Sequence, residues 1–120
     1  MTRSAVLVVE DDLLIRMQAA DMVEEAGFHA IEAGNADDAM TILETRDDIR
    51  VIFTDIQMPG SIDGLRLAHV VRHRWPPIAI IATSATEVTL NDLPAGGHFI
   101  PKPYSLADVG MHLRQVTADQ

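Results

Sequence analysis

Runs of consecutive apolar residues alternate along the chain with segments in which apolar residues recur every three or four positions. The runs at 5–9 and 51–54 are almost wholly apolar, which is typical of strands that a parallel sheet buries on both faces. Strands that alternate with helices predict an α/β domain, in which helices cover both faces of a five-stranded parallel sheet. The predicted strands are 5–9, 28–33, 51–54, 78–83 and 98–100. The predicted helices are about 13–26, 36–45 and 64–74, with a last helix after Ser105.

Capping residues and helical periodicity indicate where the helices begin and which faces turn inward. Asp12, Asn35 and Ser105 precede three of the helices and are predicted N-caps. Gly27 is predicted to end the first helix. Apolar residues with the spacing of one helical face are predicted to enter the core, namely Leu13, Met17, Ala20 and Val23 in the first helix and Leu106, Val109, Leu113 and Val116 in the last.

Acidic residues stand directly after two of the buried strands. Glu10, Asp11 and Asp12 follow the first strand, and Asp55 follows the third. Because the C-terminal ends of parallel strands meet at one edge of a sheet, Glu10, Asp11 and Asp55 are predicted to face one crevice. Like charges about 4 Å apart repel by roughly 4 kcal/mol at an effective dielectric constant of about 20. A divalent cation would relieve this repulsion, and oxygen ligands without His or Cys indicate Mg²⁺, Ca²⁺ or Mn²⁺, of which we expect Mg²⁺.

Two further polar side chains follow the fourth and fifth strands. A carboxylate such as that of Asp55 can attack a phosphoryl group and form an aspartyl phosphate. The hydroxyl of Ser84 would bond a phosphoryl oxygen, and the ammonium of Lys102 would neutralise charge opposite the metal. These residue types at the ends of four strands therefore predict phosphoryl transfer to an aspartate.

Four segments resemble the response regulator receiver family of two-component signalling, namely "VLVVEDD", "VIFTDIQMPG" with the following "IDG", "IIATSA" and "FIPKP". They occur in order over essentially the whole chain, and the resemblance implies the flavodoxin-like (βα)5 fold. It also implies that Asp55 is the phosphoacceptor and that Glu10 and Asp11 bind Mg²⁺ together with Asp55. The backbone carbonyl of Gln57 would be a further ligand, and Lys102 would contact the phosphoryl group.

The resemblance also implies a switch made of a hydroxyl and an aromatic ring. Ser84, which a small residue follows, fits the hydroxyl position best, and the adjacent Thr83 is the alternative. Neighbouring side chains on a strand point to opposite faces, so only one of the two can face the site. Phe99 matches the aromatic position that changes rotamer in the family, although a plain core role is the alternative reading.

The sequence departs from the usual family pattern in two places. Ser61 resembles a one-residue insertion before "IDG". The segment between Ser84 and Lys102 is too short for a full fourth helix followed by a strand, so 86–93 is predicted to form at most a turn or two. In this respect the chain resembles stand-alone receivers with a shortened fourth helix.

Composition narrows the class of protein and its partners. The 120 residues make one ordinary domain, 1–120, and no apolar stretch is long enough for a membrane span or a signal peptide. The net charge of −9, with a pI near 4.7, argues against direct nucleic-acid binding, which needs a basic surface. The absence of cysteine is compatible with a cytoplasmic protein.

The sequence predicts a signalling receiver and not an enzyme with turnover of its own. A histidine kinase or histidine phosphotransfer protein would donate the phosphoryl group to Asp55, and output would pass to a downstream protein target. One alternative is a phosphatase similar to haloacid dehalogenases, but that family needs an acid two residues after the nucleophile, where this chain has Gln57. The other is a pseudo-receiver that binds partners without phosphorylation, although such modules commonly lack an acid or the lysine.

Overall fold

The computed structural model describes residues 4–57, 63–85 and 92–118. Within them, five parallel strands form one sheet in the order β2-β1-β3-β4-β5. Parallel strands need crossover connections, and one helix stands between each pair of successive strands from the first to the fourth. The strands are β1 (Ala5–Val9), β2 (His29–Ala33), β3 (Ile49–Asp55), β4 (Ala79–Ser84) and β5 (His98–Pro101). The helices are α1 (Leu13–Glu25), α2 (Ala36–Thr45), α3 (Gly64–Arg74) and α4 (Leu106–Thr117).

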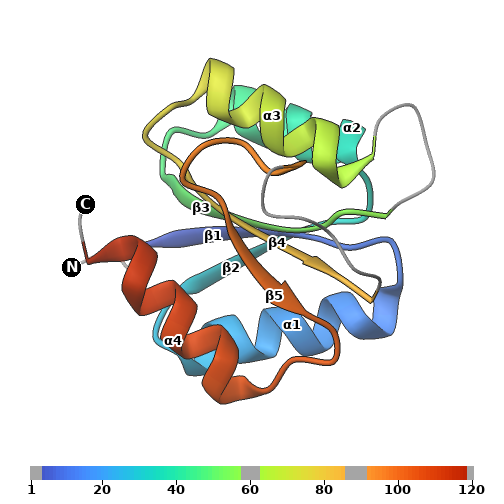
Figure 1. Cartoon of the computed structure of the whole chain (residues 1–120), viewed down its shortest axis with the longest axis vertical. Coiled ribbons are helices and arrows are strands. Elements are labelled where there is room, and N and C mark those ends of the chain that lie inside the picture. The colour runs from blue at the N-terminus through green and yellow to red at the C-terminus, as the bar shows by residue number, and fades with distance from the viewer. Residues whose placement is uncertain (1–3, 58–62, 86–91, 119–120) are drawn as a thin grey trace.

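The helices form one layer on each face of the sheet, as Figure 1 shows. Helices α2 and α3 pack on one face around Leu7, Ile52 and Ile80, and α1 and α4 pack on the other around Val8 and Phe53. The central strands β1 and β3 are therefore apolar on both faces, which explains their near-continuous hydrophobic runs. The predicted fold class and strand order of a flavodoxin-like sheet are confirmed.

The predicted helix ends agree with the observed caps. The side chain of Asp12 accepts a hydrogen bond from the backbone N–H of Ile15, and Asn35 caps α2 in the same way. Ser105 and Asp108 cap the start of α4 reciprocally. Gly27, just beyond α1, has a φ of 96°, a left-handed conformation that glycine adopts without strain.

The predicted core faces of two helices are partly wrong. Leu13 and Met17 are 59% and 51% exposed, and the inward face of α1 is formed by Ala19, Ala20 and Val23. Leu106 in α4 is also exposed. These three residues lie near the N-terminal ends of their helices. Periodicity identifies one stripe of a helix but not which of its turns lie over a core.

Two predicted features fall on residues outside the described part of the chain. The insertion at Ser61 lies in 58–62, and most of the shortened fourth helix lies in 86–91. Among the described residues, none of the helices is long and apolar enough to cross a membrane.

Candidate functional site

The acidic residues that follow β1 lie beside the acid that ends β3. The two strands are paired with Val9 opposite Thr54, so the next residues along, Glu10 and Asp55, continue side by side at the C-terminal edge of the sheet. Glu10, Asp11 and Asp55 each offer a carboxylate oxygen, and these three oxygens lie within 4.8 Å of one another. Glu10 and Asp55 are buried, whereas Asp11 is exposed. The sheet therefore brings together the three acids that the sequence singled out.

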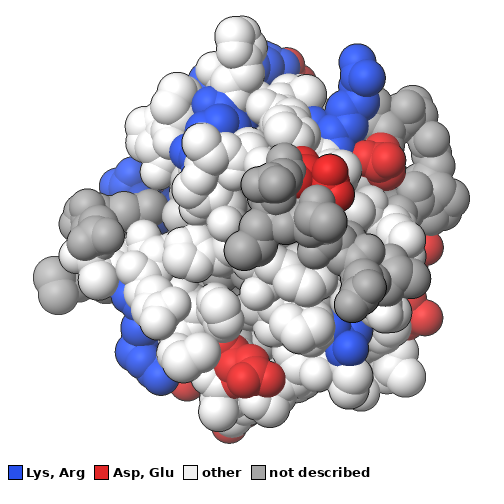
Figure 2. Space-filling model, in the orientation of Figure 1, with Lys and Arg blue, Asp and Glu red and all other residues white. Residues whose placement is uncertain are grey.

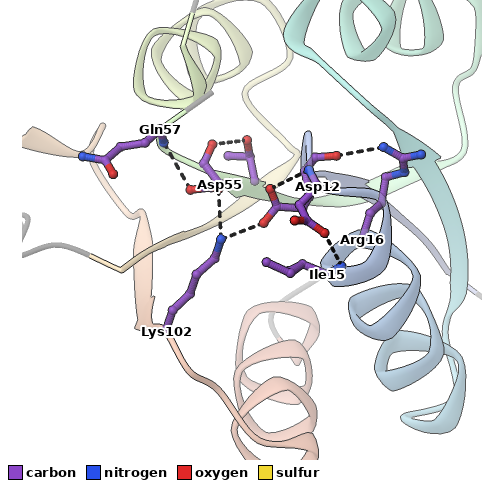
Figure 3. A network of polar contacts seen from close by, with 8 residues as sticks. Asp12, Ile15, Arg16, Asp55, Gln57 and Lys102 are labelled. Carbon is purple, nitrogen blue, oxygen red and sulfur yellow. Dashed lines mark hydrogen bonds and ion pairs between the residues drawn. The ribbon is translucent and has the colours of Figure 1, made fainter. Parts of the chain in front are cut away.

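Lys102 reaches the same cluster from beyond the end of β5. Its backbone N–H donates to the carbonyl of Ser84 at 3.0 Å, which holds the residue next to the end of β4. Its Nζ lies 2.7 Å from Oε1 of Glu10 and 3.0 Å from Oδ2 of Asp55. Figure 3 shows the side chain of Lys102 pointing toward Asp55. Its side chain is only 17% exposed, so one ammonium is shared between two carboxylates with little competing water.

Burial and charge shift the pKa of two groups in this cluster. Burial away from water raises the pKa of Glu10, although the bond from Lys102 opposes this effect. Burial alone would lower the pKa of Lys102, but the hydrogen bonds to Glu10 and Asp55 together raise it. At neutral pH the ammonium therefore stays charged between the two acids.

One backbone group also holds the carboxylate of Asp55 in place. The backbone N–H of Gln57 donates to Oδ1 of Asp55 at 3.1 Å, and Oδ2 accepts a hydrogen bond from Nζ of Lys102. Asp55 itself is only 6% exposed. Each oxygen of the carboxylate therefore has a fixed donor, which restricts its rotation. The ligand role of the Gln57 carbonyl stays a prediction.

Two hydroxyls compete for the position next to Asp55. Thr83 is the pairing partner of Asp55 across β3 and β4, and Ser84 stands one residue nearer the loop. Both residues are buried, and within the described residues the hydroxyl of Thr83 has no hydrogen-bond partner. Phe99 is half-buried and packs against the cluster of Ile56, Ala82 and Leu93. The switch roles of Ser84 and Phe99 stay predictions, with Thr83 as the alternative hydroxyl.

Sequence reasoning missed one residue that contacts this site, Arg16 in α1. Its Nη1 donates to the backbone carbonyl of Glu10 at 3.0 Å, and its Nε lies 3.2 Å from the carboxylate of Glu32 on β2. The signal in the sequence was a lone arginine one turn after the acidic run. From this pattern alone, an arginine that contacts the end of a strand cannot be distinguished from an arginine that faces solvent.

Comparison with known proteins identifies the family. The sequence profile described as "Response regulator receiver domain" matches residues 6–113. The chain belongs to this family. The transcriptional regulatory protein PdtaR of Mycobacterium tuberculosis is 33% identical to this receiver over 108 residues, which cover 87% of the chain and 52% of PdtaR. The hybrid signal transduction histidine kinase K of Dictyostelium discoideum is 33% identical over 114 residues, which cover 84% of the chain and 9% of the kinase.

The receiver fold is shared with solved structures. The receiver domain of NtrX from Brucella abortus superposes with a TM-score of 0.87 at 25% identity, covering 96% of this chain and 99% of that one. The receiver spans about half or less of the length of the two curated relatives named above. The family is that of phosphoryl-accepting receivers in two-component signalling. The acids and the lysine that meet at the edge of this sheet stand within the segments that resemble this family in sequence, and their roles stay predictions.

The arrangement fits a hard divalent cation. Three carboxylate oxygens from two strand ends converge, and the ligand set contains neither imidazole nor thiolate. Such oxygen-only sets suit Mg²⁺, which binds through one or two carboxylates and keeps several waters. The exposure of Asp11 leaves the cluster open to solvent on one side, as a water-retaining ion requires.

Proposed function

We propose that this receiver takes a phosphoryl group from a phosphohistidine onto Asp55, with Mg²⁺ held by Glu10, Asp11 and Asp55. The observation that carries the proposal is the shared contact of Lys102 with Glu10 and Asp55 beside the exposed Asp11. An oxygen of the Asp55 carboxylate attacks phosphorus, and the bond between phosphorus and the donor imidazole breaks. The electron pair of that bond returns to the imidazole nitrogen, and an acyl phosphate forms on Asp55.

The residues of this chain contribute position and charge to that step. Gln57 and Lys102 hold the two oxygens of Asp55, which removes the freedom to rotate away from an incoming phosphorus. After the transfer, the ammonium of Lys102 would contact the negatively charged phosphoryl oxygens. When bound by Glu10, Asp11 and Asp55, Mg²⁺ would help to neutralise the charge of the transferring group. The receiver thus assists its own modification without being an enzyme that turns over a separate substrate.

We also propose that the phosphodonor protein docks on the exposed apolar residues at the start of α1. Leu13, Leu14 and Met17 are 59%, 66% and 51% exposed, and Leu13 and Leu14 directly follow the acidic run in sequence. A groove of about 370 Å³ continues from α1 to the loop after β5, where Lys102 and Tyr104 line it. Exposed large apolar side chains next to a functional opening favour a protein contact. Figure 2 shows a mostly uncharged area over the part of this view where β5 and α1 lie, with charged side chains at its edges.

The docking proposal has its own test. Leu14→Glu should slow phosphoryl transfer from a phosphorylated histidine phosphotransfer protein, because a charge replaces an apolar contact. The same variant should react with acetyl phosphate at the wild-type rate, since that small donor needs no docking surface. Met111→Glu, at an exposed position in α4, is the matched control and should affect neither reaction. Equal rates of Leu14→Glu and wild type with the protein donor would refute the docking surface.

We place this receiver and its phosphodonor protein in the cytoplasm, where kinases have access to nucleoside triphosphate.

Intact mass after incubation with acetyl phosphate and Mg²⁺ tests phosphorylation itself. We expect one phosphoryl adduct on the wild type, none on Asp55→Asn, and an adduct on the control Asp47→Asn, which changes an exposed acid remote from the site. Steady turnover of phosphomonoesters without an adduct would indicate a phosphatase instead. No adduct under any condition would indicate a pseudo-receiver.

A further inference from the structure

The backbone of Glu10 is bonded on both sides to other elements of the fold. Its N–H donates to the carbonyl of Ala33 at the end of β2, at 3.1 Å. Its carbonyl accepts from Nη1 of Arg16 at 3.0 Å. Because the peptide unit is planar, a fixed carbonyl direction also fixes the N–H and Cα of the next residue, Asp11. The backbone position of the exposed acid, Asp11, is therefore set by Arg16 through the carbonyl of Glu10.

Arg16 is held firmly enough to set that direction. Its backbone N–H makes the first helical bond of α1, to the carbonyl of Asp12 at 2.9 Å. Its Nε lies 3.2 Å from Oε1 of Glu32, and its side chain is only 18% exposed. A guanidinium is planar and presents several donors in a fixed fork, so two nitrogens can satisfy two acceptors at once. In Figure 3, Arg16 lies beside the acidic cluster and not within it.

Gly34 leaves the space that the guanidinium occupies. A Cβ at this position would lie 2.9 Å from Nη1 of Arg16 and 3.7 Å from its Cζ. The atoms in the way belong to the far end of a flexible side chain, so an alanine would fit once that side chain had moved. Gly34→Ala is therefore a second way to displace the guanidinium from the carbonyl of Glu10, without removing any charge.

We propose that Arg16 is a positioning residue for the metal site, and that Gly34 makes room for it. This inference rests on the proposed function, in which Glu10, Asp11 and Asp55 hold Mg²⁺. By fixing the peptide between Glu10 and Asp11, the guanidinium keeps the Asp11 carboxylate at a set distance from that of Asp55. Outer-sphere partners of metal ligands commonly change metal affinity by about 10- to 100-fold when they are removed. We expect an effect near the lower limit, because Arg16 bonds to the backbone of the site and not to a ligand atom.

Magnesium titration of the whole chain, followed by backbone amide chemical shifts, measures this effect directly. Arg16→Gln and Gly34→Ala should each raise the dissociation constant for Mg²⁺ about tenfold. Arg16→Lys should lie between these variants and the wild type, because an ammonium can reach the carbonyl of Glu10 but lacks the fork for Glu32. Arg46→Gln, which breaks an exposed ion pair with Asp48, is the matched control and should bind Mg²⁺ as the wild type does.

A second measurement separates positioning from general stability. The unfolding midpoint is recorded for each variant in chelator and in saturating Mg²⁺, and the rise caused by Mg²⁺ is compared. We expect this rise to shrink for Arg16→Gln and Gly34→Ala, whatever their stability in chelator. If both variants lose stability in chelator but keep the wild-type dissociation constant and the wild-type rise, Arg16 supports only the fold and the inference is overturned. If the wild type itself binds no Mg²⁺, the proposed function fails and the inference fails with it.

Discussion

Gly64, the first residue of α3, lies directly against the backbone carbonyl of Asp55. A Cβ on Gly64 would overlap that carbonyl oxygen, and the backbone N–H of Gly64 donates to the carbonyl of Ile56 at 2.8 Å. The end of β3 and the start of α3 are therefore in contact through their backbones. The backbone of Asp55 therefore packs against Gly64, which lies nine positions later in the chain.

Gly64→Ala should displace Asp55 and slow its phosphorylation. Because the obstructing atoms belong to backbone, they cannot move aside cheaply, and we expect a loss of about 1–3 kcal/mol in the free energy of unfolding. Gly27→Ala is the matched control, since its φ of 96° strains an alanine by about 1–2 kcal/mol while nothing lies within 4 Å of the added Cβ. Urea unfolding measures both losses, and the rate of adduct formation with acetyl phosphate should fall only for Gly64→Ala. Equal rates in the two variants would contradict this reading of the contact.

Lys102→Met should destabilise the metal-free protein. The change leaves Glu10 and Asp55 buried and facing each other without their shared cation, at a cost of about 3 kcal/mol at neutral pH. The loss should shrink when Mg²⁺ is added or when the pH falls far enough to protonate Glu10, whose pKa burial raises. Arg74→Met, which breaks the exposed pair with Glu44, is the control and should cost less than about 1 kcal/mol under all conditions. A loss for Lys102→Met that Mg²⁺ and acid leave unchanged would mean that charge is not its cause.

Two substitutions separate the hydroxyls at the end of β4. Thr83→Val removes a buried hydroxyl that has no partner among the described residues, so we expect it to raise stability by about 1 kcal/mol and to leave phosphorylation unchanged. Ser84→Ala should instead alter the rates at which the adduct forms and is lost, as a contact to the phosphoryl group requires. Adduct kinetics from intact mass and urea unfolding supply the two measurements. Slow kinetics in Thr83→Val with normal kinetics in Ser84→Ala would transfer the switch role to Thr83.

His112 should make stability depend on pH below neutrality. Burial, and then the neighbouring His98, lower the pKa of His112 from 6.5, and its Nδ1 has no partner within the part of the chain described. As the pH falls below about 6.5, the unfolded chain takes up this proton before the folded protein does, so stability is lost. Replacing the imidazole in His112→Gln should flatten the curve of unfolding free energy between about pH 7.5 and about pH 5.5. The exposed-histidine variant His73→Gln should keep the wild-type slope, and an unchanged slope in His112→Gln would refute the assignment.

The sequence predicted the sheet well because buried parallel strands show near-continuous apolar runs. It placed the start of β3 two residues late, because the exposed Arg50 interrupts the apolar pattern after the buried Ile49. The inward turns of α1 were harder to predict, since Leu13 and Met17 have the right spacing but lie beyond the apolar layer that Val23 enters. Periodicity reports the direction of a side chain and contains no information on what lies opposite.

The site was predictable as far as topology determines it. Parallel strands put their C-terminal ends at one edge, so the meeting of Glu10, Asp55 and Lys102 follows once the strands are assigned correctly. The contact of Arg16 with a backbone carbonyl depends on a rotamer and on the space above Gly34, neither of which has a periodic signal. Groups that act through the backbone are the ones that pattern reasoning overlooks.

The depth of Asp55 also bears on how long a phosphoryl group would remain on it. Only 6% of the residue is accessible, so little of its surface is open to a hydrolytic water. In the proposed complex, a protein seated over Leu13 and Leu14 would reduce the access of water to Asp55 further. We therefore expect the lifetime of the phosphorylated state to depend both on this domain and on the protein that is bound over its site.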